Sequence, residues 1–253
     1  MTRGAAELVA AEGGAIQSGM RRALLLALLP ASLVWASCYP RASVPDTERT
    51  LASRELEGQR RTTKVALHVG PFFGDGSKLL ASDQPFEELD LLQTTDQEPI
   101  RPPRAERILP PGTPVRVEKV EFPTGWLIAK RVVMTPRYHP WVYLSLAGEQ
   151  RPLVLVLPQT LATAEDVRVE LERTLGMGDT AAAYLALPDA QRAAVAKKQL
   201  LEGMAPQAVE MAWGYPEKKI IDRPARTEAW TWPGERRRAF LENDKLQRWE
   251  PTR

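Results

Sequence analysis

The residue types that most often carry chemistry are scarce in this chain. It has two histidines, His68 and His139, and a single cysteine, Cys38. Two histidines fall short of the three or four ligands that a zinc site needs, and no CxxC or HExxH spacing accompanies them. The sequence also lacks a phosphate-binding glycine loop and a GxSxG nucleophile elbow. It therefore predicts a protein that is not an enzyme, with no metal and no cofactor.

Cys38 is the remaining candidate for chemistry, and the residues before it indicate its role. Two arginines are followed by an apolar run, residues 23–36, broken only by a proline and a serine. A basic region, an apolar region and small residues form, in that order, a secretory signal. The run is shorter than the roughly 20 residues that span a bilayer as a helix. We therefore predict a signal peptide over residues 1–37, with Met20, just before the arginines, as its expected true start.

The triplet Ala36-Ser37-Cys38 resembles the end of bacterial lipoprotein signals, in which the cysteine is acylated and becomes the first residue of the mature chain. Trp35 departs from that pattern, because Leu, Val or Ile usually stands there. A lone thiol has no disulfide partner and is open to oxidation outside the cell, which favours lipidation. Because Tyr39 rather than Asp follows the cysteine, the resemblance implies an anchor on the periplasmic side of the outer membrane. Cleavage after Ala36 is the alternative and would give a secreted or periplasmic soluble protein.

Composition indicates an ordinary globular protein. Hydrophobic residues make up 43% of the chain, and its net charge is +2. These values are typical of a folded domain, and they leave no electrostatic footprint for nucleic acid. Residues 38–61 are polar and show little apolar periodicity, so we predict a lipid-anchored flexible tether there. Two parts are expected to follow: a β-rich domain over 62–160, and a helical segment plus an α+β module over 163–253.

The β-rich domain is predicted from short apolar stretches between glycine and proline turns. Such stretches indicate a small antiparallel sheet or barrel. The run from Pro111 to Val117 resembles the entry to a Src-homology-3-like barrel of bacterial envelope proteins. The predicted strands are residues 63–69, 114–122, 126–134, 141–146 and 151–157.

The pattern becomes helical at Thr163, a capping residue with Asp166 in the first turn that follows it. Val167, Leu171 and Leu175 then recur on one helix face. The overall prediction is therefore an α+β fold. Further helices, after Pro188 as far as Gly203 and from Pro206 to Gly214, precede strands at 217–222, 227–232 and 237–241, with a fourth near Leu246.

The C-terminal residues carry a second resemblance. The matching features, in order, are Gly203-Met204, Val209, Gly214-Tyr215-Pro216, Trp230 and Trp232, and Phe240 before Asn243-Asp244. This order resembles the SmpA/OmlA-like (BamE-like) module of lipoproteins, although Ala205 replaces the usual hydroxyl residue and Trp232 the usual Tyr. The resemblance covers 200–249 and implies two short helices on a three-stranded antiparallel sheet, with a role in outer-membrane β-barrel assembly. It transfers no partner-contact residue.

These residues also have structural interpretations of their own. Gly203 and Gly214 supply backbone conformations that end helices. Trp230, Trp232 and Phe240 are expected to alternate onto one sheet face and to bury large areas in the core.

A polar-aromatic group of residues supplies a candidate binding surface: Trp126, Tyr138, His139 and Trp141. The first functional hypothesis is a non-catalytic scaffold or outer-membrane assembly protein, held to the membrane by a lipid and contacting another envelope protein. The second is a binding module that holds a peptide or cell-wall fragment through the β-rich domain. A third is an enzyme with an unrecognised site.

Overall fold

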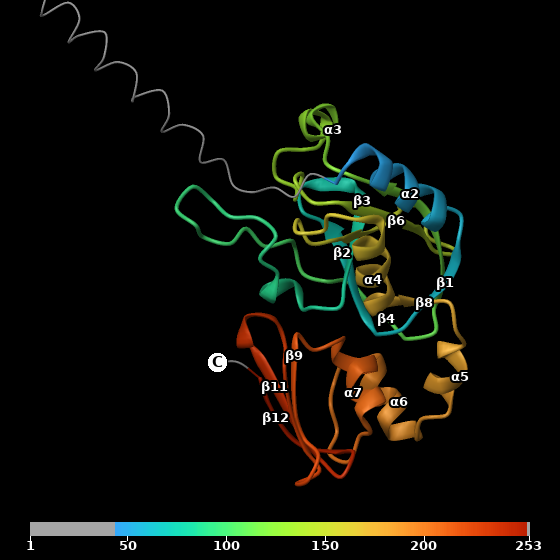
Figure 1. The fold of residues 1–253 in the computed structure, drawn as a ribbon, viewed down its shortest axis with the longest axis vertical. Coiled ribbons are helices and arrows are strands. Elements are labelled where there is room, and N and C mark those ends of the chain that lie inside the picture. Colours follow the sequence, from blue (N-terminus) through green and yellow to red (C-terminus); the bar gives the residue numbers. More distant parts are fainter. Residues whose placement is uncertain (1–43, 252–253) are drawn as a thin grey trace, which may run out of the picture. The chain divides into compact units, whose positions relative to one another are not determined.

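The computed structural model describes residues 44–251, and they form an α+β fold built on two sheets (Figure 1). The predicted signal peptide and Cys38 lie outside the described residues. No helix between residues 44 and 251 is long and apolar enough to cross a bilayer.

The larger sheet runs in the order β4-β2-β3-β7-β6-β5-β1-β8. Its neighbours pair antiparallel except β3 and β7, which are parallel, so the sheet is mixed. The predicted strands at 114–122, 141–146 and 151–157 are confirmed as β5, β6 and β7. The strands are β1 (Arg60–Thr63), β2 (Leu67–Phe72), β3 (Asp75–Ser82), β4 (Arg107–Leu109), β5 (Pro114–Glu121), β6 (Trp141–Ser145), β7 (Leu153–Val156) and β8 (Leu175–Gly176).

Two helices, α2 (Asp46–Leu56) and α4 (Ala164–Thr174), share a hydrophobic core with this sheet. The start of α4 is confirmed as a capping box: the Thr163 hydroxyl accepts from the amide of Asp166, and the Asp166 carboxylate accepts from the amide of Thr163. The predicted apolar face of α4 is also confirmed, because Val167, Leu171 and Leu175 are fully buried.

Helix α2 shows that the predicted flexible tether over 38–61 is wrong from Asp46 onward. Ala52 and Leu56 of this helix are buried in the core of the large sheet, and Val44 just before it is 5% exposed. The helix has few apolar positions, so its sequence shows little periodicity, yet two side chains suffice to dock it. Strand β1 also begins within the predicted tether, at Arg60.

The predicted strand at 126–134 is wrong as well. Residues Gly125–Lys130 form a helix, α3, whose N-cap Thr124 accepts a hydrogen bond from the amide of Leu127. Strand β5 pairs directly with β6, with Glu121 opposite Trp141, so the apolar run between them has no place in the sheet. It forms an external connection instead.

The other face of the large sheet carries a second, smaller core. Its buried side chains come from β2, β3, β6, β7 and from residues 86–89, which include the short 3-10 helix η2 (Phe86–Glu88). Phe72 and Trp141 meet edge to face there, with ring centroids 4.9 Å apart.

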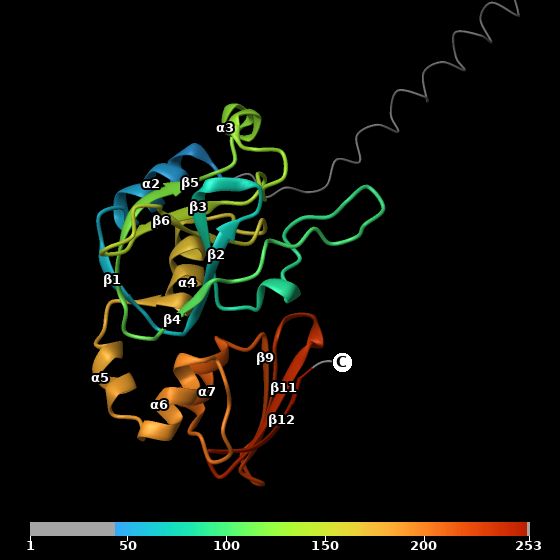
Figure 2. The same cartoon turned by 180° about the vertical axis from the view of Figure 1, so that it is seen from behind.

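The C-terminal part is a separate sheet in the order β12-β11-β10-β9, antiparallel throughout (Figure 2). Helix α7 begins with Pro206 in its first turn and ends at Gly214, as predicted. Its buried side chains share a core with Trp230, Trp232 and Leu246. The elements are α5 (Thr180–Leu185), α6 (Asp189–Ala196), α7 (Pro206–Trp213), β9 (Lys218–Asp222), β10 (Thr227–Thr231), η3 (Pro233–Glu235), β11 (Arg237–Glu242) and β12 (Lys245–Pro251).

The predicted domain boundary at 160–163 is corrected by this arrangement. Leu171 and Leu175 belong to the core of the large sheet, and Gly176 of β8 pairs with Thr62 of β1. The segment 163–253 is therefore not one packing unit, because its first helix completes the β-rich part. The division between the two cores falls after Gly176.

Three details of the C-terminal part differ from expectation. The sheet has four strands rather than the three that the resemblance implies, although the fourth, β12, confirms the strand predicted near Leu246. Helix α6 ends at Ala196 rather than near Gly203. Phe240 does not share a face with Trp230, because Trp230 pairs with Ala239 and adjacent residues of a strand point to opposite faces. Phe240 lies on the outer face, where the Arg248 guanidinium stacks on it at 3.6 Å.

Candidate functional site

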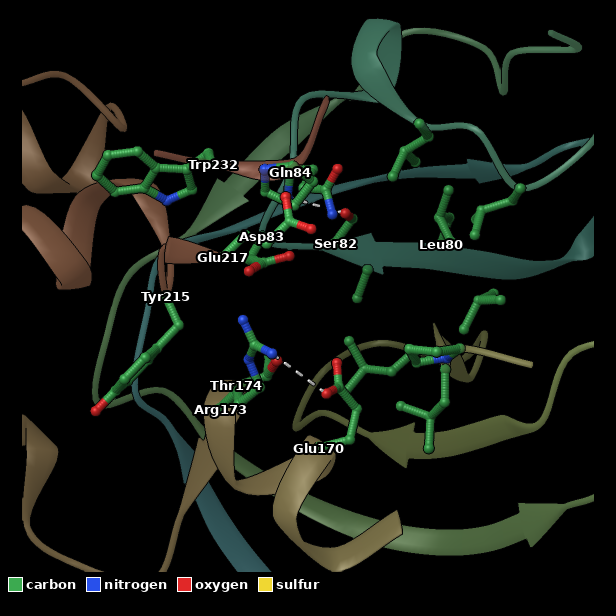
Figure 3. A pocket seen from close by; sticks show the side chains of 18 residues that line it. Leu80, Ser82, Asp83, Gln84, Glu170, Arg173, Thr174, Tyr215, Glu217 and Trp232 are labelled. Atoms are coloured by element: carbon green, nitrogen blue, oxygen red, sulfur yellow. Dashed lines mark hydrogen bonds and ion pairs between the residues drawn. The ribbon is translucent and has the colours of Figure 1, made fainter. Parts of the chain in front are cut away.

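A cavity of about 380 Å³ is lined by both parts of the molecule (Figure 3). Strands β3 and β7 and the last turn of α4 supply one set of lining residues. The segment after α7, with Tyr215 and Glu217, and the residues after β10, with Trp232, supply the other. The cavity therefore forms only when the two cores are in contact.

The lining of this pocket divides by chemistry. Leu80, Leu89, Leu91 and other apolar side chains line part of it. Its polar part holds three carboxylates and one guanidinium; in Figure 3, Asp83 and Glu217 lie together, with Glu170 and Arg173 across from them. The charged residues are Asp83, Glu170, Glu217 and Arg173.

The pocket is electrostatically suited to a cation. Burial raises the pKa of Glu170; the charge of Arg173 opposes that rise and the charge of Asp83 adds to it. The Arg173 Nη1 atom lies 3.6 Å from Glu170 Oε2, which is an ion pair at long range. The lining itself holds three carboxylates and one guanidinium, and the charge of Asp83 also acts on buried Lys198 and Arg237. A ligand with an ammonium group and an apolar body matches the carboxylates and the apolar part of the lining.

Gly214 lies directly against Asp83, one of the residues that line the pocket. Its φ is +86°, and a Cβ built there would lie 2.5 Å from Asp83 Oδ2. The carbonyl of Gly214 accepts a hydrogen bond of 3.1 Å from the indole Nε1 of Trp232. The predicted role of this glycine in ending α7 is confirmed, and close approach to Asp83 is a second reason why no side chain fits. Gly203, with φ +79°, is also in the left-handed region, but its predicted role in ending the helix after Pro188 is wrong, because α6 ends at Ala196.

Buried charges join the two parts close to the pocket. The Lys198 ammonium donates to the carbonyl of Ala66, with Nζ 2.6 Å from the oxygen. The amide of Ala66 donates to the carbonyl of Met211 at 2.7 Å. Burial lowers the pKa of Lys198 to about 7, with Asp83 opposing and Arg237 adding to the effect.

Arg237 and His68 complete this junction. Arg237 Nε lies 3.1 Å from Glu88 Oε2, and the guanidinium lies 5.1 Å from the centroid of the Trp213 ring. His68 Nε2 and Arg237 Nη2 are buried without a hydrogen-bond partner among residues 44–251. Burial, then the charges of Lys198 and Arg237, lowers the pKa of His68 to about 3, so this ring is neutral at physiological pH.

The four residues of the predicted binding surface do not form one surface. Trp126 is 71% exposed at the start of α3, whereas Trp141 is 2% and His139 8% exposed. The Trp141 indole donates to the carbonyl of Pro136, and His139 Nδ1 lies 2.9 Å from the carbonyl oxygen of Leu157. Tyr138 is half-buried beside the guanidinium of Arg137. Only Trp126 of the four remains a well-exposed aromatic.

Arg131, which the sequence does not single out, fixes the position of this segment. It donates to Glu121 Oε1 through Nε at 3.0 Å and Nη2 at 2.8 Å, and to the carbonyls of Arg137 and His139 through Nη1. Its guanidinium stacks on Trp141 at 3.6 Å. Burial raises the pKa of Glu121, but hydrogen bonds from Lys119 and Arg131 outweigh it and hold that pKa below its usual value.

Residues 44–251 contain no group of three or more His, Cys, Asp or Glu side chains placed to hold a metal ion. Nothing in the sequence predicts that the junction residues Asp83, Lys198 and Arg237 are wholly or partly buried, because an isolated charged residue is usually exposed to solvent. Only the positions of the flanking apolar residues, which bury these charges, distinguish them.

The chain matches no family model, and neither a curated protein nor a solved structure matches it at a significant level.

Proposed function

We propose that this protein is a lipid-anchored envelope protein with a non-catalytic scaffold or outer-membrane assembly role. The anchor rests on the basic and apolar residues that lead to Ala36-Ser37-Cys38. The observation that carries the non-catalytic role is that side chains able to do chemistry are engaged in structural hydrogen bonds. His139 and Trp141 contact backbone carbonyls inside the fold, and Lys198 does the same at the junction.

The C-terminal part supports the assembly role. The proposal draws on helix α7, its glycine exit and the buried pair Trp230 and Trp232, which are the features that carry the SmpA/OmlA-like resemblance. The extra strand and the outward Phe240 depart from it. We therefore propose a related module with a modified sheet, whose partner is another envelope protein.

The test of the anchor is Cys38→Ser in the full chain, expressed in a Gram-negative host with a radiolabelled or clickable palmitate analogue. The parent chain should take up label and sediment with outer membranes, because buried acyl chains contribute about 0.8 kcal/mol per CH₂. Cys38→Ser should lose the label and move to the soluble fraction. Ser37→Ala, which keeps a small residue before the cysteine, is the matched control and should behave as the parent. Label uptake by Cys38→Ser would contradict the anchor.

A second function, binding of a peptide or cell-wall fragment, is favoured by the pocket between the two cores. Its excess of carboxylates next to leucine side chains matches a peptide with a free amine and an apolar neighbour. Calorimetry with short peptides that carry a lysine or diaminopimelate side chain tests this function. Glu170→Gln should weaken binding at least several-fold, whereas Glu172→Gln, an exposed position on the same helix, should not. Equal affinities of both variants and the parent would exclude the pocket.

A further inference from the structure

Four exposed apolar side chains gather in and just after α3, and we call them the apolar tip. They are Trp126, Val132, Val133 and Met134, exposed by 71%, 45%, 67% and 49%. The two valines and the methionine are consecutive, and Trp126 is the most exposed of the large hydrophobic residues described. A soluble protein rarely concentrates such side chains without an interaction to cover them.

The segment that carries the apolar tip has basic side chains and no acidic side chain of its own. The connection between β5 and β6, residues 122–140, contains no Asp or Glu and three basic residues. Lys130 is exposed and lies over the Trp126 ring, with Nζ 4.6 Å from its centroid. Tryptophan beside lysine, with aliphatic neighbours, is the combination that binds the interface of an anionic bilayer.

The apolar tip stands on a rigid base. Arg131, directly between α3 and the three aliphatic residues, is held by Glu121 and by two backbone carbonyls. The Thr135 hydroxyl donates to the carbonyl of Val132 at 2.7 Å. Exposure of these side chains is therefore built into the fold, and membrane binding would require no ordering of this segment.

The position of the apolar tip relates it to the proposed anchor. Both views place α3 and α2 at the end of the folded part that lies away from the C-terminal sheet (Figures 1 and 2). Val44 is buried just before α2, and only residues 39–43 separate it from Cys38. Even a fully extended chain spans roughly 20 Å over that distance. An acylated Cys38 therefore holds this end of the protein close to the bilayer.

We propose that the apolar tip inserts into the interfacial layer of a phospholipid bilayer and orients the protein on the membrane. The orientation, though not the insertion itself, rests on the proposed lipid anchor at Cys38. A bilayer suits the tip better than a protein partner does. Four side chains on a protruding helix and turn cover far less than the roughly 800 Å² per partner that stable protein interfaces bury.

The experiment measures Trp126 depth in vesicles of phosphatidylethanolamine and phosphatidylglycerol whose acyl chains carry bromine. The full chain, purified in detergent and reconstituted, should show quenching of tryptophan fluorescence. Trp126→Phe should lose most of that quenching, because Trp141, Trp213, Trp230 and Trp232 are buried and the half-buried Trp249 packs against the C-terminal core. Val133→Asp, with Trp126 retained, should reduce quenching several-fold. Met177→Ser, at a position 68% exposed and away from α3, is the matched control and should leave quenching unchanged.

The outcomes separate this inference from the anchor. If the parent chain and Cys38→Ser partition alike while quenching still depends on Trp126 and Val133, the anchor fails and the apolar tip stands. If acylation is found but Trp126→Phe and Val133→Asp quench as the parent does, the tip does not enter the bilayer and the inference is overturned. Circular dichroism of each variant verifies the fold. If Val133→Asp unfolds, Val133→Ser takes its place in the quenching measurement. If the vesicles leave Trp126 fluorescence unquenched and only an added envelope protein changes that fluorescence, the tip binds a protein partner and the proposal is overturned.

Discussion

Two buried arginines, one in each part of the molecule, make the same two kinds of contact. Each lies over a tryptophan ring and pairs with a glutamate, but their hydrogen bonds are not equally complete. Arg131 stacks on Trp141 and pairs with Glu121, and Arg237 lies over Trp213 and pairs with Glu88. Both arginines are less than 10% exposed. Each therefore depends on its neighbours for the hydrogen bonds that water would otherwise supply.

The two sites differ in how completely those hydrogen bonds are made. Arg131 reaches its carboxylate through two nitrogens and also donates to backbone carbonyls. Arg237 Nη2 has no hydrogen-bond partner among residues 44–251, and buried Lys198 adds a second positive charge close by. A fully satisfied network makes its surroundings rigid, whereas an unsatisfied one destabilises them. The base of the apolar tip is thus the fixed region, whereas the junction leaves buried hydrogen-bonding groups unsatisfied.

The largest effect is expected at the fixed region. Arg131→Met should lower the free energy of unfolding by about 3–5 kcal/mol, because it removes the buried partner of the Glu121 carboxylate and the donor to two backbone carbonyls. Arg237→Met should cost less, about 1–2 kcal/mol, since Glu88 is 23% exposed and water can replace the guanidinium. Urea denaturation of both variants measures the difference. Equal losses would show that hydrogen-bond completeness does not distinguish the two sites.

The second effect concerns the glycine at the junction. Gly214→Ala combines a backbone conformation, φ 86° and ψ −179°, that costs about 1–3 kcal/mol for other residues with a contact of 2.5 Å to Asp83. Gly203→Ala is the matched control, because its φ is +79° but a Cβ there has open space. Thermal unfolding should show a clearly larger decrease in Tm for Gly214→Ala. If the two decreases are the same, Asp83 moves aside at no cost and the wall of the pocket is not tightly packed.

Local patterns predicted local structure well in this chain. The cap at Thr163 and the exit of α7 at Gly214 follow from residue types within a few positions. The segments whose structure was predicted wrongly are those in which contacts with residues distant in the sequence determine the structure. Residues 126–134 have the apolar content of a strand, yet β5 pairs with β6 and leaves them no neighbour.

The candidate site depended even more on distant partners. The pocket needs Asp83 and Glu170 from one part and Glu217 from the other, and no spacing in the sequence links them. Of the predicted surface, Trp126 is exposed, but on a helix rather than on the predicted strand. Trp141 was not, because a strand residue shows its orientation only once the pairing of the strand is known.

The third effect is a change in pH dependence. The pKa of Lys198 is lowered to about 7 in the folded protein from an ordinary value near 10.5. Between these values the unfolded chain binds more protons than the folded one, so stability rises with pH across this window and is lost as the pH falls toward 7. Asp83, Glu88 and Arg237 are the charged groups that act on Lys198. Lys198→Met should therefore flatten the increase in unfolding free energy between pH 7 and pH 10 in urea titrations.

His68 provides the internal control for that measurement. Its pKa is lowered to about 3 from 6.5, so it removes stability as the pH falls from 6.5 toward 3. Lys198→Met should keep this acid limb, and His68→Phe should remove it while leaving the alkaline limb. A parent protein whose stability is constant from pH 7 to pH 10 would show that Lys198 keeps its charge without cost.

The smallest effect is expected at the apolar tip and contrasts with the base that supports it. Trp126 is 71% exposed and Trp141 only 2%, although both lie in or beside the same connection. Trp126→Ala should change the free energy of unfolding by about 0.5 kcal/mol or less, which is typical of surface positions. Trp141→Ala should cost about 3–5 kcal/mol, because it empties a packed site beside Phe72 and Arg131. Calorimetric unfolding of the two variants without lipid measures both losses of stability. A substantial loss for Trp126→Ala would mean that this side chain stabilises the fold, and a membrane role would no longer be needed to explain its exposure.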